Sequence, residues 1–271
     1  MQNFPSDLQK HRPRKRFGQN FLYDRLIVSQ ILGAINPRPQ DHLVEIGPGT
    51  GALTESLLSQ CTWLDVVELD RDLVAGLKAR FAGVGHLKIH GMDALKLDLT
   101  ALRIGDEKMR LIGNLPYNIS TPLIFHLLEF AAVIQDMHFM LQKEVVDRIC
   151  AEPGSKVFGR LSVMVQLHYR TEKLFEVPPE CFRPSPKVHS AVLRLIPDPA
   201  TQALVIDRNH LLSLIRQAFS QRRKTLRNTL KARFSAHEIA AAGIDPGTRA
   251  ESLAVSDYIR LSNYLSRNES E

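Results

Sequence analysis

The order of apolar and polar residues divides the first half of the chain into short apolar runs and segments of helical period. The runs are rich in β-branched residues and lie at 43–46, 64–68, 87–89, 109–113 and 137–140. Between them, segments such as 53–58 and 73–81 place apolar residues three or four positions apart. This alternation predicts an α/β fold with a parallel sheet, whose ligands bind beyond the carboxyl ends of the strands.

The second half has a different pattern. Helical period is expected after Glu144 as far as Val165, with a break at 152–155, and again throughout 207–265, with a break at 245–247. Two further strands, 173–177 and 188–196, flank a proline-rich turn at 178–186, which is suited to presenting Phe182. We therefore expect a basic flexible tail over 1–18, an α/β domain over 19–198 and a small all-helical domain over 199–271.

Composition narrows the class of protein. Apolar residues make up 44% and charged residues 24% of the 271 residues, as in soluble globular proteins. There is no apolar run of about 18 residues to span a membrane and no signal-peptide core near the N-terminus, so we expect a cytoplasmic protein. The three cysteines, Cys61, Cys150 and Cys181, are far apart in the sequence, which predicts neither disulfides nor a zinc site. His86 and His90 flank a short strand instead of sharing one face of a helix, so no metal site is expected.

The net charge of +6 comes from two short segments. One holds Lys10, Arg12, Arg14, Lys15 and Arg16, and the other holds Arg222, Arg223, Lys224, Arg227, Lys231 and Arg233; without these eleven the charge is 6 − 11 = −5. Such clustering favours a polyanion partner, most often nucleic acid. The alternative is a disordered basic tail together with a solvated helix face.

The first strand runs into Glu45-Ile46-Gly47-Pro48-Gly49-Thr50-Gly51-Ala52, a glycine loop before a helix. Glycines at this turn let a ligand approach the backbone. Glu68, at the end of the second strand, could accept hydrogen bonds from ribose hydroxyls, and Met92 with Asp93 offers an apolar wall and a carboxylate for adenine. The pattern indicates an adenosine-containing cofactor; a nicotinamide dinucleotide also fits the glycines, although Glu45 disfavours a pyrophosphate.

The tetrapeptide Asn114-Leu115-Pro116-Tyr117 follows the fourth strand. An amide oxygen together with a main-chain carbonyl can accept both hydrogens of an exocyclic amine such as adenine N6, which draws them out of the ring plane and frees the nitrogen lone pair. Tyr117 would stack on the base. Phe182 could cover its other face, unless its role is ordinary core packing.

The glycine loop, Glu68, Asp93 and Asn114 to Tyr117 resemble the motifs of class I S-adenosylmethionine methyltransferases, which have a Rossmann-like sheet. Together with 14–22, 139–145 and 221–228, they resemble the ribosomal RNA adenine N6,N6-dimethyltransferases, particularly those acting on the small subunit. The resemblance implies S-adenosylmethionine as cofactor, bound by Asn20, Leu22, Gly47, Gly49, Glu68, Asp93 and Asn114.

The same resemblance implies the substrate. It is two adjacent adenosines in the hairpin loop near the 3′ end of small-subunit (16S) ribosomal RNA, each methylated twice while the subunit assembles. Residues expected to hold the RNA are Arg14, Lys15, Arg16, Arg222, Arg223, Lys224 and Arg227. We expect a monomer. Two alternatives stay open: a resistance methylase acting on large-subunit RNA, and a non-catalytic RNA-binding factor with the same fold.

Overall fold

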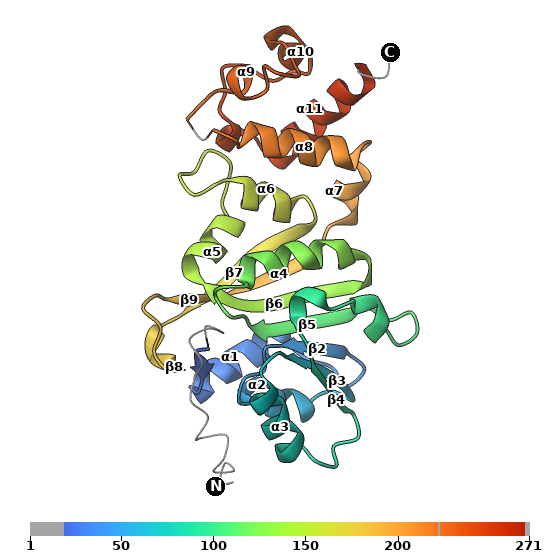
Figure 1. Ribbon diagram of the computed structural model, residues 1–271, viewed down its shortest axis with the longest axis vertical. Coiled ribbons are helices and arrows are strands. Elements are labelled where there is room, and N and C mark those ends of the chain that lie inside the picture. The colour runs from blue at the N-terminus through green and yellow to red at the C-terminus, as the bar shows by residue number, and fades with distance from the viewer. Residues whose placement is uncertain (1–18, 222, 269–271) are drawn as a thin grey trace. The chain divides into compact units, whose positions relative to one another are not determined.

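The computed structural model describes residues 19–221 and 223–268, so the predictions for Arg14, Lys15, Arg16 and Arg222 lie outside the described residues. The described chain forms two compact units (Figure 1). The sheet unit consists of residues up to 146 together with 172–197, and the helical unit consists of 147–171 together with 198 onward. Each unit is described by itself below.

A seven-stranded sheet with the order β4-β3-β2-β5-β6-β9-β7 organises the sheet unit. Its strands are β2 (His42–Ile46), β3 (Trp63–Glu68), β4 (Leu87–Gly91), β5 (Met109–Asn114), β6 (Ile134–Gln142), β7 (Tyr169–Val177) and β9 (Ser190–Pro197). Strands β4, β3, β2, β5 and β6 are parallel, and β9 is antiparallel to β6. The predicted parallel sheet is confirmed, and all five predicted runs of the first half are strands.

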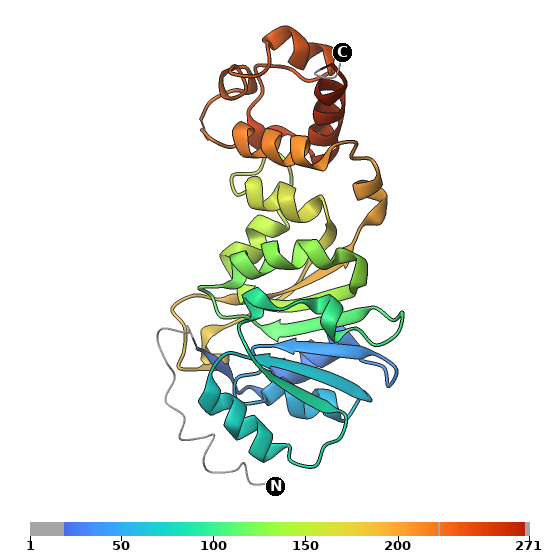
Figure 2. The same cartoon turned by 45° about the vertical axis from the view of Figure 1, so that its right-hand side comes forward.

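Helices α1 (Arg25–Ile35), α2 (Ala52–Leu58) and α3 (Arg71–Arg80) gather around β2 to β4, whereas α4 (Ser120–Leu127) lies beside β6 in both views (Figures 1 and 2). Leu57 and Leu77 from the helices share a buried cluster with Leu43 and Leu64 from the strands. The apolar face of each helix therefore packs against strand side chains that point to the same side of the sheet, as the apolar periodicity of the sequence predicts. Short 3-10 helices occupy connections: η3 (Ala94–Lys96), η4 (Leu99–Leu102), η5 (Leu128–Val133) and η6 (Pro179–Cys181).

A separate two-stranded ribbon pairs β1 (Phe21–Leu22) antiparallel with β8 (Phe182–Arg183). Phe21 lies opposite Arg183, and Leu22 lies opposite Phe182. Leu22 and Phe182 are both buried in the core cluster, while Phe21 and Arg183 lie on the other side of the ribbon. The ribbon thereby joins the segment before α1 to the proline-rich turn.

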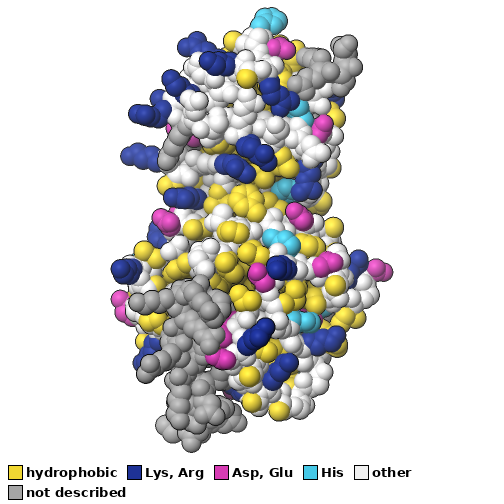
Figure 3. All heavy atoms as spheres, in the orientation of Figure 1, with side chains coloured by type: hydrophobic (Ala, Val, Ile, Leu, Met, Phe, Trp, Pro, Cys, Tyr) yellow, Lys and Arg dark blue, Asp and Glu magenta, His cyan; other side chains and the backbone are white. Residues whose placement is uncertain are grey.

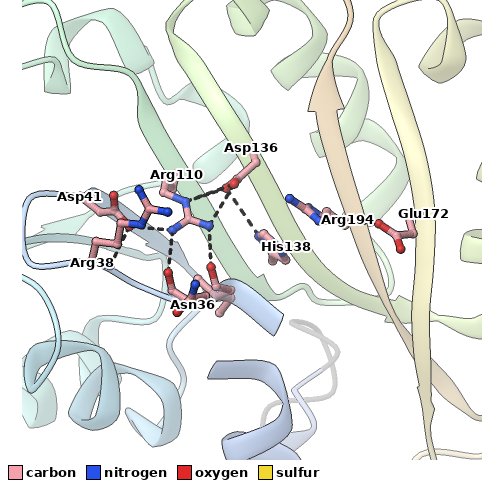
Figure 4. Close-up of polar contacts among 9 residues, drawn as sticks. Asn36, Arg38, Asp41, Arg110, Asp136, His138, Glu172 and Arg194 are labelled. Carbon is pink, nitrogen blue, oxygen red and sulfur yellow. Dashed lines mark hydrogen bonds and ion pairs between the residues drawn. The ribbon is translucent and has the colours of Figure 1, made fainter. Parts of the chain in front are cut away.

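At the amino ends of β5 and β6, a buried arginine holds the sheet to the end of α1 (Figure 4). Arg110 donates to both carboxylate oxygens of Asp136, to Asp41 at 2.6 Å and to the Ile35 carbonyl oxygen at 2.6 Å. Burial raises the pKa of Asp136, but the nearby His138 and the hydrogen bonds and charge of Arg110 outweigh it, so the pKa lies below its usual range. Loss of one partner would leave a buried charge uncompensated, which is strongly destabilising.

The helical unit is built from shorter pieces than the sequence predicted. Its helices are α6 (Arg160–Gln166), α7 (Pro199–Ala203), α8 (Arg208–Ala218), α9 (Leu226–Thr229), α10 (Ala236–Ala241), η7 (Ala250–Ser252) and α11 (Val255–Asn268); α5 (Lys143–Ile149) crosses from the sheet unit. The sequence predicted helix over 207–265 with one break at 245–247. The structure interrupts this region more often, for example where Ser235 and Glu238 form a capping box that starts α10. In residues 19–221 and 223–268, no helix has the length and hydropathy needed to cross a membrane.

The boundary between units differs from the predicted single break at 198. The chain does leave the sheet unit after Pro197, where Asp198 caps α7. Residues 147–171, however, belong to the helical unit rather than to a continuous domain over 19–198. Backbone hydrogen bonds from Gly154 N–H to the Glu251 carbonyl at 2.7 Å and from Asp198 N–H to the His168 carbonyl at 2.8 Å hold them there. Contacts between residues so distant in sequence leave no periodic signal.

Candidate active site

A cavity of about 310 Å³ opens at the carboxyl ends of the parallel strands. Its walls come from the segments that follow β2, β3, β4 and β5, and from β1 with the two residues before it. Ligand sites in α/β sheets lie at this edge, as the sequence predicted. The lining includes all the predicted cofactor residues: Asn20, Leu22, Gly47, Gly49, Glu68, Asp93 and Asn114.

The glycine loop is tightly enclosed by its neighbours. Gly47 and Gly49 both have positive φ angles, +69° and +59°. A Cβ atom on Gly49 would lie 2.8 Å from Phe21 Cδ1, and one on Gly47 would lie 3.5 Å from the Asn114 carbonyl oxygen. Both φ angles favour glycine, and at Gly49 the Phe21 ring also leaves no room for a Cβ atom, whereas one at Gly47 would be at ordinary contact distance. The loop lies against the last residue of β5, so the two strongest motifs of the sequence share one wall of the cavity.

Glu68, the last residue of β3, is 8% exposed and borders the cavity. Its Oε1 accepts a hydrogen bond from the Asp70 N–H at 2.9 Å. Burial raises the pKa of Glu68, although backbone N–H groups of Asp70, Gly49 and Leu69 oppose this effect. The carboxylate is thus fixed beside the glycine loop. Asp93 is anchored in a similar way, since its Oδ1 accepts from the Leu95 N–H at 3.0 Å.

A third carboxyl group of the cavity lining comes from β2. Glu45 is buried, and Thr54 Oγ1 donates to its Oε2 at 2.6 Å. Burial raises the pKa of Glu45 to about 7; the Thr54 hydrogen bond lowers it, and the charge on Glu68 raises it further. This carboxyl therefore changes its protonation state near neutral pH. The sequence singled out Glu45 only as an acid that disfavours a pyrophosphate, because the partnership with Thr54 depends on the fold.

Asn114 ends β5 with its amide held in one orientation. Its Nδ2 donates to the Asn20 carbonyl oxygen at 3.0 Å. Because a carbonyl can only accept, this contact identifies the nitrogen end of the amide and leaves Oδ1 as its acceptor. The next residue, Leu115, is buried, and its N–H donates to the Met140 carbonyl of β6. The Pro116 carbonyl accepts from the Ile119 N–H at 3.1 Å, closing a turn before α4.

Tyr117 is half-buried in the cavity wall. Its hydroxyl is 2.7 Å from Ser190 Oγ, at the start of β9. Burial raises the pKa of Tyr117, while the Ser190 contact lowers it, so the phenol stays neutral at physiological pH. Ser190 is fully buried, and its contact with the hydroxyl fixes the position of the Tyr117 ring. The sequence did not single out Ser190, because only the pairing of β9 with β6 brings it there.

Phe182 corrects one expectation. The sequence suggested that it covers one face of the target base, with core packing as the alternative. In the structure Phe182 is 2% exposed, packs in the core cluster with Leu22, and is not part of the cavity lining. Strand alternation in the β1–β8 ribbon explains the difference, since it turns Phe182 inward and Arg183 outward.

The basic residues of the helical unit lie on its surface. Arg223, Lys224 and Arg227 are exposed, while Leu226 and Leu230 beside them are buried. The basic side chains of this segment thus face solvent, and the apolar ones are packed inside the unit. Figure 3 shows Lys and Arg side chains gathered over this unit, with few acidic side chains among them.

The histidines considered as metal ligands have other partners. His90 Nε2 and His42 Nε2 contact the two carboxylate oxygens of Asp65 at 2.5 and 2.7 Å, and His86 Nε2 lies 3.4 Å from the Leu58 carbonyl oxygen. Burial opposes ionisation of Asp65, but these contacts and one from Trp63 hold its pKa below the usual range. Within the described ranges, no group of three or more His, Cys, Asp or Glu is placed to hold a metal ion.

Comparisons with known proteins give one consistent result. A family model described as "Ribosomal RNA adenine dimethylase" matches residues 10–267. Proteins named ribosomal RNA small subunit methyltransferase A are 55% identical in Methylococcus capsulatus, covering 94% of this chain and 99% of that one, and 54% identical in Pseudomonas fluorescens, covering 94% and 95%.

Two solved structures share the fold. A dimethyladenosine transferase from Plasmodium falciparum has a TM-score of 0.78 at 25% identity, covering 92% of this chain and 98% of that one. The 23S rRNA methyltransferase ErmE has a TM-score of 0.72 at 24% identity, covering 91% and 100%. The predicted Rossmann-like methyltransferase fold is thereby confirmed.

Proposed function

Because the chain belongs to the ribosomal RNA adenine dimethylase family, we propose that it dimethylates N6 of two adjacent adenosines in small-subunit ribosomal RNA. The adenosines lie in the hairpin loop near the 3′ end, and the reaction accompanies assembly of the subunit. The methyl donor is S-adenosylmethionine, the cofactor of this family. A monomer in the cytoplasm is the state in which we expect it to act.

The residues that line the cavity are chemically suited to this cofactor. Gly47 and Gly49 leave the backbone open for the methionine part, Glu68 offers a fixed buried carboxylate to the ribose hydroxyls, and Asp93 lies where a carboxylate can meet the adenine amine. Asn20 and Leu22 close the wall from β1. S-adenosylmethionine supplies an already electrophilic methyl group, so the protein has to bind, orient and exclude water.

The observation that carries the proposal is the fixed amide of Asn114 at the edge of this cavity. With Nδ2 held by Asn20, its Oδ1 can accept one hydrogen of adenine N6. The second acceptor is the main-chain carbonyl of Leu115 or of Pro116; the Pro116 carbonyl already accepts one hydrogen bond, from the Ile119 N–H. Two acceptors at one amine draw its hydrogens out of the ring plane and leave the lone pair free to attack the methyl group.

Tyr117 completes this arrangement. Its ring, tethered through Ser190, offers a flat face on which the flipped adenine can stack. The same face favours the positive charge that moves onto N6 as the new bond forms. A proton then leaves N6 for solvent, so none of the described side chains is required as a strong base. Positioning accounts for the catalysis, as expected for a positively charged methyl donor.

The basic residues of the helical unit bind the RNA backbone in this proposal. Arg223, Lys224 and Arg227 are exposed together on the helical unit and carry charges suited to phosphate. Target adenosines in a hairpin loop are unpaired and easily turned out of the stack.

The direct test uses small ribosomal subunits from cells that lack this chain. After incubation with methyl-labelled S-adenosylmethionine, the RNA is digested to nucleosides and separated by mass. We expect label in N6,N6-dimethyladenosine, mapped to adjacent adenosines near the 3′ end. Label elsewhere, or none, would reject the proposal. Large-subunit RNA as the sole substrate should stay unlabelled, which separates this function from that of a resistance methylase.

A further inference from the structure

Next to the cavity, the outer face of the β1–β8 ribbon carries an aromatic residue and an arginine in contact. The Arg183 guanidinium carbon lies 4.3 Å from the centroid of the Tyr23 ring. Strand alternation puts Phe21 and Arg183 on one face and the buried Leu22 and Phe182 on the other, and Tyr23 follows β1 with its ring against Arg183. Phe21 also lines the cavity, so this outer face continues directly from the cofactor site.

The Tyr23 ring is held rigidly although it is 47% exposed. Its hydroxyl donates to the Glu180 carbonyl oxygen at 2.6 Å, and its backbone N–H donates to the Cys181 carbonyl oxygen at 3.1 Å. Tyr23 contributes little to the core because its ring is exposed, although its hydroxyl and its backbone N–H are both held by hydrogen bonds. It does provide a flat support that keeps the guanidinium in one plane.

The charge of Arg183 is not neutralised. It is exposed, and in the part of the chain that the structure describes it has no acidic partner within ion-pair distance. From Arg183 to Ser190 the sequence carries Lys187 and His189 but no acidic residue. This segment ends where Ser190 contacts the Tyr117 hydroxyl. Two cationic side chains, Arg183 and Lys187, are thus exposed in the segment that leads from the ribbon to the Tyr117 contact, while the acidic Asp24 and Glu180 lie beyond the other end of the ribbon in sequence.

From this arrangement we propose that Tyr23 and Arg183 form a phosphate clamp for the RNA strand flanking the target adenosine; the inference rests on the proposed function. A guanidinium fixed flat presents paired N–H donors, the geometry that matches two phosphate oxygens. Anchoring the neighbouring phosphate holds the strand while the adenosine is turned into the cavity. The clamp is independent of the basic residues of the helical unit.

The test compares Arg183→Gln with Arg38→Gln. Arg38 is exposed in the same unit but precedes β2, at the opposite edge of the sheet from the cavity. Binding to unmethylated small subunits is measured over a range of potassium chloride at constant magnesium, and cofactor affinity reports correct folding. We expect Arg183→Gln to weaken binding about fivefold to tenfold and to lower the slope of log affinity against log salt by about 0.7–0.9. Arg38→Gln should do neither.

Two further variants keep the test decisive if Arg183→Gln folds poorly. Arg183→Lys keeps the charge and should keep the salt slope, yet bind more weakly because the paired donors are lost. Tyr23→Leu should also weaken binding with an unchanged slope. Arg183 variants that bind like Arg38→Gln, while wild-type protein methylates the subunits, would overturn the clamp alone. Wild-type protein that does not methylate adenine would instead overturn the proposed function.

Discussion

The carboxylate of Glu68 is the group that we propose to bind the ribose, and substitution tests this role. Glu68→Ala should weaken S-adenosylmethionine binding by about 1–3 kcal/mol, because a charge-assisted hydrogen bond to the ribose is lost. Calorimetry on the purified protein measures this directly. Glu129→Ala, an exposed glutamate outside the cavity lining, is the matched control. Equal affinities for the two variants would place the ribose elsewhere.

Glu45 makes stability depend on pH. Its pKa is about 7 in the folded protein and near 4.5 when unfolded, so the folded state binds more protons between these values. The contribution of Glu45 to stability is therefore complete below pH 4.5 and is lost as pH rises through 7. Its size is on the order of 3 kcal/mol.

Glu45→Gln keeps the shape and the Thr54 contact but cannot ionise. Urea unfolding of the cofactor-free protein from pH 5 to pH 8 should show a smaller loss of stability with pH in this variant than in the wild type. The comparison cancels the opposite contributions of Asp65 and Asp136, which have lowered pKa values and are the same in both proteins. Parallel stability curves would show that Glu45 does not titrate in this range.

At the scale of elements, the close approach of β5 to β2 depends on one glycine. A Cβ atom on Gly113 would overlap the van der Waals sphere of the Ile46 carbonyl oxygen, a backbone atom that cannot rotate away as a side chain could. Gly113→Ala should lower the free energy of unfolding by about 1–3 kcal/mol through overpacking. Gly33→Ala, inside α1 with no atom near the added methyl, should instead raise it by about 0.5–1 kcal/mol. Urea unfolding that shows no difference between them would contradict this packing.

Elements with strong periodicity were predictable, and those fixed by distant contacts were not. The strands from 43 to 140 and the edge that binds ligand follow from alternation and from the position of the glycine loop. The β1–β8 ribbon joins two-residue strands far apart in the sequence, so its register, and with it the inward turn of Phe182, leaves no pattern. Ser190 was missed for the same reason. Asn114 could be singled out because the predicted motif, Asn114 to Tyr117, is a run of consecutive residues.

At the scale of the whole molecule, the exposed basic residues should determine the affinity for RNA without taking part in methyl transfer. Binding to small subunits should fall steeply with salt if the exposed basic residues contact phosphate. Replacing Arg223, Lys224 and Arg227 together by Gln should lower the salt slope by roughly 2–3, since each lost phosphate contact removes about 0.7–0.9. The control replaces Arg38, Lys78 and Arg103 of the sheet unit in the same way. Identical slopes for the two triple variants would show that the basic residues of the helical unit are solvated and do not contact phosphate.

The central claim is that the fixed Asn114 amide and a main-chain oxygen hold adenine N6 in position for methyl transfer. Single-turnover methylation of small subunits by Asn114→Ala, at saturating S-adenosylmethionine, tests it most directly. We predict a rate about 10²–10³ lower than wild type, the usual cost of removing one well-placed polar group, with RNA affinity nearly unchanged. A wild-type rate in this variant would contradict the account.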